Sequence, residues 1–218
     1  MGLEALLAFV PALSALKGEV TVVVDGPLGP NGPPTIQRNI DRECQRGSFQ
    51  RRAVPASVTG GGRALVDATY RVVDALVGAQ TGPAFRFSRC RAPGGPALQI
   101  FETMPTVGLA VLLPMVSDVA HVPSRATPID GTTQKSDFYW SRGAGRLVGG
   151  ILSCPEAGEE TDHDLRAALY CASVAVQIVK PSTRAPVCIG AAATGTYVLA
   201  GPEDPTWSAE ITRVGRVP

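Results

Sequence analysis

The sequence predicts an α/β fold in which short apolar strands alternate with amphipathic helices. The strongest observation is VTVVVD at 20–25, a β-branched run that ends at a Gly-Pro turn and is typical of a central strand buried on both faces. A second apolar strand, ALQIFE, is predicted at 97–102. A third observation is the helical periodicity over 165–180, which stops at Pro181. We therefore expect helices packed on a largely parallel sheet.

The chain of 218 residues is long enough for one domain with a sizeable core. We expect a single domain over 1–218, with a loop-rich insertion around 116–134 where periodicity is lost. Other helices are predicted over the first fifteen residues or so, over 36–46, over 63–79, from Pro105 onward, and in a Gly-interrupted segment that ends near Leu152. The tail, 194–207, predicts a strand and a turn.

The helix predicted at 165–180 carries two apolar stripes. Its small side chains would allow a close approach to the sheet, and Asp164 lies at the head of that small stripe. Thr161 and Asp164 also match a capping box, which accounts for Asp164 without any catalytic role. The first stripe contains Leu165, Leu169, Ala172, Val176 and Val179, and the second Ala168, Cys171 and Ala175.

Composition limits the classes of function. The formal net charge is only +1, but the segment 36–91 holds ten arginines and four acidic residues, a local excess of +6 that favours an anionic partner. Five dispersed cysteines without a CxxC pair argue against a disulfide framework or structural zinc, and no secretory signal or membrane span is evident. We expect a cytoplasmic protein with no membrane contact.

Two predicted strands end in a carboxylate, at Asp25 and Glu102. The carboxyl ends of parallel strands are where open α/β sheets place their ligands. Asp25 can equally open an Asx-type turn. On the predicted helix 36–46, Arg38 and Arg42 align and could hold phosphate, although pairing with Asp41 on a solvated face is the more common arrangement.

Several separated motifs together resemble the family of predicted RNase H-like nucleases known as domain of unknown function 429. They keep the order and rough spacing expected for that family from about Val20 to the tail. The motifs are VVVDGPLG, RNIDR at 38–42, IFETMP at 100–105, KSDFYW at 135–140, HDLRAALYCA at 163–172 and GTYVLAGP at 195–202.

The resemblance implies an RNase H-like mixed sheet flanked by helices and a divalent-metal-dependent nuclease or phosphohydrolase. It maps the family's carboxylates onto Asp25, Glu102 and Asp164, which would be both catalytic residues and ligands for Mg²⁺ or Mn²⁺. The substrate would be nucleic acid or a small phosphorylated ligand. Its phosphates would be contacted by Arg38, Arg42, Arg51, Arg52 and Lys135.

The departures from the family open an alternative. No N-terminal hairpin with a Gly-Asp pair precedes VTVVVD, and Ala167 stands in place of the family's second acid in the last helix. The resemblance thus implies an N-terminally truncated sheet, which a homo-oligomer could complete. The alternative function is a catalytically inactive RNase H-like remnant that binds an anion or a protein.

Overall fold

The structure is a computed structural model of the chain. It describes residue 8 and residues 19–29, 33–49, 61–78, 98–115, 135–180, 185–191, 195–202 and 204–215. The predicted N-terminal helix, the insertion around 116–134 and the arginines 51 and 52 lie outside these ranges.

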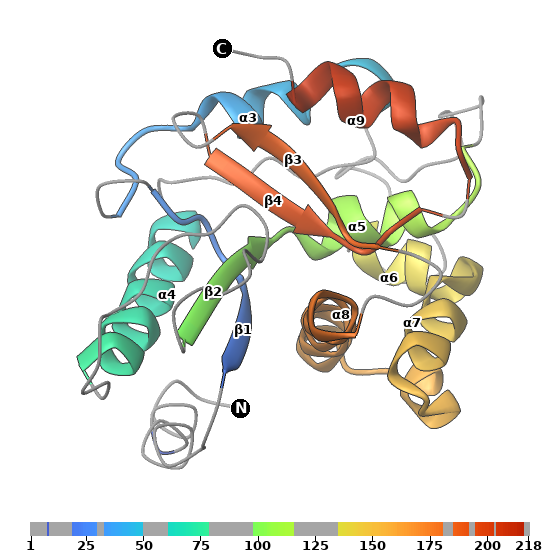
Figure 1. The fold of residues 1–218 in the computed structure, drawn as a ribbon, viewed down its shortest axis with the longest axis horizontal. Helices are drawn as coiled ribbons and strands as arrows, with labels where there is room; N and C mark the ends of the chain where they lie inside the picture. The colour runs from blue at the N-terminus through green and yellow to red at the C-terminus, as the bar shows by residue number, and fades with distance from the viewer. Residues whose placement is uncertain are drawn as a thin grey trace.

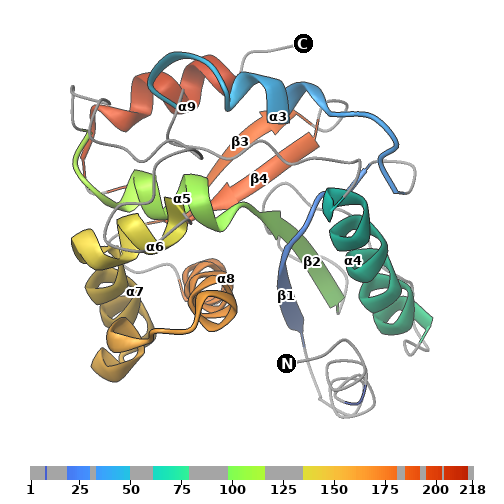
Figure 2. The same cartoon turned by 180° about the vertical axis from the view of Figure 1, so that it is seen from behind.

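Strand β1 (Val20–Asp25) pairs in parallel with β2 (Leu98–Thr103), as the sequence predicts. Helix α4 (Gly61–Gly78) lies on one side of the pair and α8 (His163–Val179) on the other (Figure 1, Figure 2). Ile100 packs with the α4 side chains, whereas Phe101 packs with those of α8, because neighbouring residues of a strand point to opposite faces.

The prediction that β1 is a central strand buried on both faces is wrong. Residues 20–24 are only half-buried and Asp25 is exposed. The physical reason is that β1 pairs with β2 alone among the described strands, so no described strand covers its other edge.

A second sheet is formed by the hairpin of β3 (Val187–Ala191) and β4 (Gly195–Leu199), which pair antiparallel. The single mixed sheet expected from the family resemblance is therefore not formed by the described residues, which make two two-stranded sheets instead. Helices α3 (Asn39–Glu43) and α9 (Trp207–Gly215) cover the hairpin (Figure 1). Helix α3 is shorter than the predicted 36–46, and α9 was not predicted.

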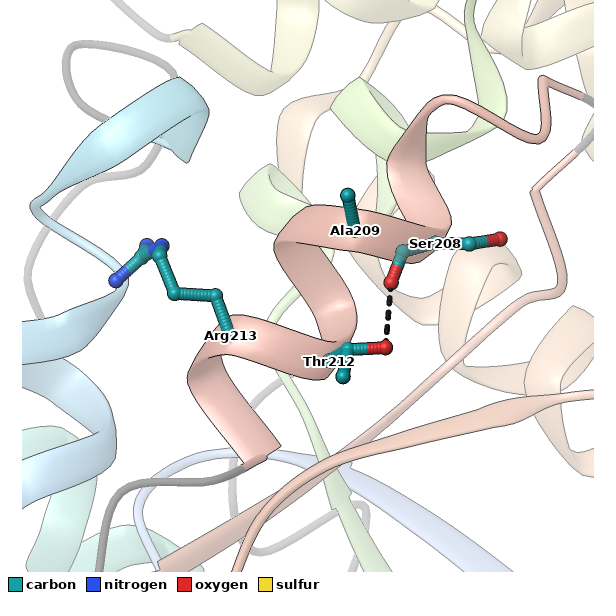
Figure 3. A pocket seen from close by; sticks show the side chains of 4 residues that line it. All are labelled: Ser208, Ala209, Thr212 and Arg213. Atoms are coloured by element: carbon teal, nitrogen blue, oxygen red, sulfur yellow. Dashed lines mark hydrogen bonds between the residues drawn. The ribbon is translucent and has the colours of Figure 1, made fainter.

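Arg213 joins α9 to α3. Its Nη1 lies 3.0 Å from Glu43 Oε2, its Nη2 donates to the Arg46 carbonyl at 3.0 Å, and its Nε lies 3.0 Å from Glu210 Oε2. Figure 3 shows this arginine extended towards the α3 segment beside a shallow surface depression. Arg213 is the charged residue that lines the depression, and Glu43, Glu210 and the Arg46 carbonyl already bind its guanidinium. The depression therefore offers no unpaired cation to a ligand.

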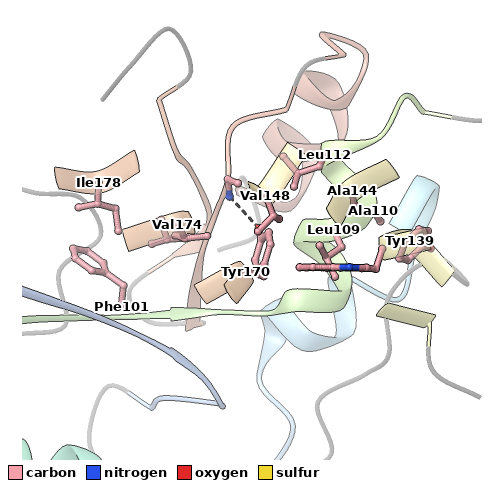
Figure 4. Close-up of a cluster of buried hydrophobic side chains, with 13 residues drawn as sticks. Phe101, Leu109, Ala110, Leu112, Tyr139, Ala144, Val148, Tyr170, Val174 and Ile178 are labelled. Carbon is pink, nitrogen blue, oxygen red and sulfur yellow. Dashed lines mark hydrogen bonds between the residues drawn. The ribbon is translucent and has the colours of Figure 1, made fainter. Parts of the chain in front are cut away.

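The largest core cluster lies where β2, α5 (Pro105–Leu112), α7 (Gly145–Leu152) and α8 meet (Figure 4). Tyr170 is fully buried within it, and its hydroxyl accepts a hydrogen bond from the Ala200 backbone N–H at 3.0 Å. This bond attaches the end of β4 to α8. Buried tyrosines generally need such a partner.

Helix α8 buries a different side from the one its apolar pattern suggests. The buried residues include Tyr170, Val174 and Ile178, whereas Leu165 and Val179 are 47% and 48% exposed. The predicted stripe headed by Leu165 therefore faces outward. In the second predicted stripe, Ala168 is exposed to solvent and Ala175 is partly exposed, whereas Cys171 is buried.

The remaining elements connect these layers. A π-helical turn at Trp140–Ala144 joins α6 (Lys135–Tyr139) to α7, and Gly143 there has φ 116°, a conformation that glycine adopts without a steric cost. The predicted Gly-interrupted helix thus ends at Leu152, as expected. Short 3₁₀ turns occur at Gly47–Phe49 and Pro155–Glu159. None of the described helices combines the length and apolarity needed to cross a bilayer.

The packing of Gly108 against Tyr170 gives a test of this fold. A Cβ at position 108 would overlap the Tyr170 hydroxyl and ring. We expect Gly108→Ala to lower the free energy of unfolding by about 2–3 kcal/mol in urea titrations, through overpacking and loss of the Ala200 hydrogen bond. Gly150→Ala is the matched control: its Cβ would have open space, so it should be neutral or stabilising by up to about 1 kcal/mol. Equal effects of the two changes would contradict this packing.

Candidate functional site

A buried ion network follows the carboxyl end of β2. The guanidinium of Arg38 binds both oxygens of Glu102, with Nη1 2.5 Å from Oε2 and Nη2 2.6 Å from Oε1. Glu102 Oε2 also accepts the Leu28 backbone N–H at 2.9 Å. This forked geometry is the strongest form of a carboxylate–arginine pair.

Asp41 and Tyr197 complete the network. Asp41 Oδ1 lies 2.8 Å from Arg38 Nη2, and Asp41 Oδ2 accepts from Arg38 Nε at 3.1 Å. The Tyr197 hydroxyl accepts from Arg38 Nη2 at 2.9 Å and donates to Asp41 Oδ1. Together these contacts tie α3 to β2 and β4, so the cluster holds the two sheets together.

Burial governs the electrostatics of this network. Burial raises the pKa of Glu102 to about 7, even though the Arg38 hydrogen bonds and charge favour the ionised form. Burial opposes the charge of Arg38, but the hydrogen bonds and charge of Glu102 and the contact with Asp41 outweigh it and hold the pKa of Arg38 above its ordinary value. Arg38 therefore remains a cation, with Glu102 as its main partner and Asp41 as a second one.

A second polar site lies at the carboxyl end of β1. Crowding by protein atoms raises the pKa of Asp25 to about 6, although the residue keeps solvent contact; His163 lowers this pKa and Asp164 raises it further. Asp25 also adds to the burial effect that raises the pKa of Cys171. The first turns of α8 thus lie within electrostatic reach of Asp25. We call Asp25, Asp164 and His163 the acidic corner.

The acidic corner is supported by the segment that begins α6. The Asp137 carboxylate lies 3.1 Å from His163 Nδ1 and 2.9 Å from Arg166 Nη1. Ser136 Oγ is 3.3 Å from the same His163 nitrogen. Because serine and aspartate share one ring nitrogen, these three residues do not have the arrangement of a catalytic triad, in which the two nitrogens serve different partners.

The predicted convergence of three acids is not found. Asp25 is in register with Thr103 and Val24 with Glu102, so the Asp25 and Glu102 side chains point to opposite faces of the sheet. Asp164 shares a face with Asp25, not with Glu102. No group of three or more His, Cys, Asp or Glu side chains that could hold a metal occurs in the described part of the chain. These residues do not fit the two-metal centre that the family resemblance implies.

The predicted phosphate-binding arginines are also dispersed. Arg38 is buried and saturated by the network. Arg42 is exposed and donates to Asn39 Oδ1. Arg51 and Arg52 lie outside the described residues, as does the side chain of Lys135.

Sequence reasoning placed Asp41 on a solvated face, and it missed Asp137, His163 and Tyr197 as structural partners of the two sites. The ion pair of Asp41 with Arg38 could have been predicted, because the two residues stand three apart, within one helical turn. The role of Tyr197 depends on a contact across 159 residues, for which the local sequence carries no signal.

No family model, curated protein or solved structure matches this chain. The site is therefore interpreted from its own geometry.

The Glu102 network predicts a large effect of a nearly isosteric change. Glu102→Gln replaces one acceptor of the Arg38 fork by an amide donor, and we expect a loss of about 2–3 kcal/mol in the free energy of unfolding, measured in urea. Asp67→Asn, in the exposed Arg63 pair, is the control and should stay within about 0.5 kcal/mol. A Glu102→Gln protein as stable as the control would show that the fork does not stabilise the fold.

The raised pKa of Asp25 predicts a pH-dependent stability. An acid that titrates near 6 in the folded protein and near 3.8 when unfolded favours folding below pH 4, and this contribution is lost as the pH rises towards 6. Asp25→Asn removes the ionisation, so its melting temperature relative to the native protein should increase between pH 4.5 and 7.5. Hydrogen bonds from Leu165 and Asp164 N–H hold the pKa of Asp162 below 3.8, so the Asp162→Asn difference should stay constant over that range. A flat Asp25→Asn profile would contradict the assignment.

Proposed function

We propose that this chain is a protein-binding module of RNase H-like ancestry, without the two-metal hydrolysis expected of the family that it resembles. The observation that carries the proposal is the forked Arg38–Glu102 pair. Glu102 lies on the face of the sheet opposite Asp25, and both of its carboxylate oxygens bind Arg38 there. A carboxylate that already accepts three hydrogen bonds in a buried network has no role in holding an ion at the acidic corner.

Binding of an anion is less well supported than binding of a protein. The arginine that the sequence places at the centre of an anion site, Arg38, donates to Leu28, Asp41, Glu102 and Tyr197. Its guanidinium therefore has no donor left for a phosphate. Asp162 and Asp164, exposed at the start of α8, are both acidic, which favours a basic group on the partner.

Exposed apolar surface supports the protein-binding role. Leu165 and Val179 on α8 are two of the four large apolar side chains that are exposed in the described residues, and the β1 edge is half-buried. An apolar surface bordered by charges is typical of a protein interaction site. Cys44, Cys154 and Cys171 are free thiols, which supports the proposal that the protein is cytoplasmic.

A metal-dependent nuclease or phosphohydrolase is the second candidate. It is favoured by the raised pKa of Asp25, since carboxylates with such shifts cluster at functional sites. Mg²⁺ or Mn²⁺ would be its cofactor, and nucleic acid or a small phosphorylated ligand its substrate. No group of three or more His, Cys, Asp or Glu side chains arranged to hold a metal occurs among the described residues, which weighs against it.

A cleavage assay separates the two functions. We expect the pure protein with Mg²⁺ or Mn²⁺ to cleave single-stranded and duplex DNA and RNA, and a generic phosphomonoester, no faster than its Asp25→Ala variant. Asp25 is exposed, so the variant should fold, and its melting curve checks this. Metal-dependent turnover that the Asp25→Ala change abolishes would overturn the proposal and establish the hydrolase.

A further inference from the structure

We propose that α7 and the π-helical turn before it form a docking surface for an acidic segment of a partner protein. This inference rests on the proposed protein-binding function and adds a contact surface of opposite charge to the acidic corner. Helix α7 lies at the outer edge of the fold in both views (Figure 1, Figure 2). The surface, called here the α7 face, consists of Arg142, Arg146, Leu147, Gly150 and Ile151.

Two arginines of the α7 face carry charges without a carboxylate partner. Arg142 and Arg146 are exposed, stand four residues apart and form no ion pair in the described part of the chain. Like charges at this spacing in a helical segment repel each other. Other arginines of the chain do bind carboxylates, namely Arg46, Arg63, Arg166 and Arg213. Arg142 and Arg146 are therefore available to the acidic groups of a partner.

Both guanidinium groups lie beside the π-helical turn. Arg142 Cζ is 5.1 Å from the centroid of the Phe138 ring, a cation–π contact that orients the group without neutralising it. Arg146 Nη2 reaches back to Gly143, where it would lie 3.7 Å from a Cβ at that position. Single π-helical turns within helices are frequent at functional sites. The two cations thus occupy the N-terminal end of the α7 face.

Gly150 has no packing role within the chain. It is exposed inside α7, and a Cβ there would meet no atom within 4 Å. Gly145 and Gly149 differ, since their Cβ atoms would lie 2.8 Å from the Gly158 carbonyl oxygen and 2.9 Å from that of Cys154. Alanine is more stable than glycine inside a helix. A glycine at position 150 therefore suits the close approach of another chain.

Leu147 and Ile151 supply the apolar part of the α7 face. They stand one helical turn apart, next to Arg146 and Gly150 in the sequence, and both remain partly exposed. Partly exposed apolar side chains beside two unpaired cations match a segment that carries both acidic and apolar residues. The glycine between them would let the backbone of that segment come close to α7.

Nearby acids favour a protein segment over a nucleic acid. The 3₁₀ turn Pro155–Glu159 packs on α7 at Gly145 and Gly149, and its Glu156 and Glu159 are exposed. A nucleic acid carries a phosphate at every nucleotide, so a strand on the α7 face would bring further phosphates towards these carboxylates. A protein segment can place two acidic residues opposite the arginines and none beyond them.

Peptide selection tests the α7 face. We expect the pure full chain to enrich, from a displayed library of random peptides, sequences that combine Asp or Glu with Leu, Ile or Phe. Counter-selection on the Arg142→Gln, Arg146→Gln double variant restricts the enrichment to peptides that need these arginines. Failure to enrich such peptides, or enrichment of peptides without acidic residues, would overturn the proposal. Neither outcome alters the cleavage assay, which tests the proposed function separately.

Fluorescence anisotropy of the most enriched peptide measures the contribution of the charges. We expect a dissociation constant on the order of 10–100 µM. The double arginine variant should weaken binding at least about 10-fold, whereas Arg46→Gln, at an exposed arginine of another surface, should change it less than about twofold. Equal effects of the two would show that the peptide binds elsewhere. An oligothymidine that binds more tightly than the peptide would overturn the proposal in favour of a nucleic acid.

Gly150→Ala separates docking from folding. The added methyl group meets no atom of the chain, so the melting temperature should stay the same or rise. The same methyl group would occupy space that the bound segment needs, so peptide binding should weaken at least about threefold. An unchanged affinity would contradict the close approach at Gly150, and the proposed docking surface would then be wrong.

Discussion

The buried fork between Arg38 and Glu102 is the interaction on which the rest of the structure depends. It connects the turn after β1, helix α3, strand β2 and, through Tyr197, strand β4. The two sheets share none of the described strands, so these strands give no hydrogen-bonded ladder between them. A buried arginine bonded to two carboxylates can connect them, because loss of Arg38 would leave buried carboxylates without a counter-charge and loss of an acceptor would leave buried N–H groups unsatisfied. The same interaction determines which carboxylates remain available for function.

Register explains why one acid of the predicted site is absent from it. The sequence correctly predicts both strands and their parallel direction, but Glu102 does not end its strand: β1 ends at Asp25, whereas β2 continues to Thr103. The side chains of Asp25 and Glu102 would share a face only if they were paired in register or offset by an even number of residues. The actual offset is one, since Val24 pairs with Glu102. No local pattern encodes this offset, which depends on how α4 and α8 pack on the two faces.

The parts of the fold that could be predicted are those with a local cause. Periodicity located α4 and α8, Pro105 marked the start of α5, and Pro181 marked the end of α8. The predicted capping box of Thr161 and Asp164 is not formed, because Asp162 caps the helix and its Oδ1 accepts the N–H groups of Asp164 and Leu165. The side that α8 buries could not be predicted, because its apolar residues surround much of the helix and Tyr170 with Gln177, rather than Leu165, face the core. Gln177 is buried since its Oε1 accepts the Gly201 N–H, a contact made by a distant segment. Tertiary hydrogen bonds thus override the hydrophobic pattern.

The raised pKa of Asp25 reflects its surroundings at the start of α8. Burial is the largest cause, His163 favours the charge on Asp25, and Asp164 disfavours it. A basic group of a partner placed beside Asp164 would lower that repulsion and favour the ionised form of Asp25. By reciprocity, ionisation of Asp25 would then favour association by the same free energy. In the proposed protein-binding function, the carboxylates of the acidic corner would therefore make the contact selective for a basic partner and sensitive to pH.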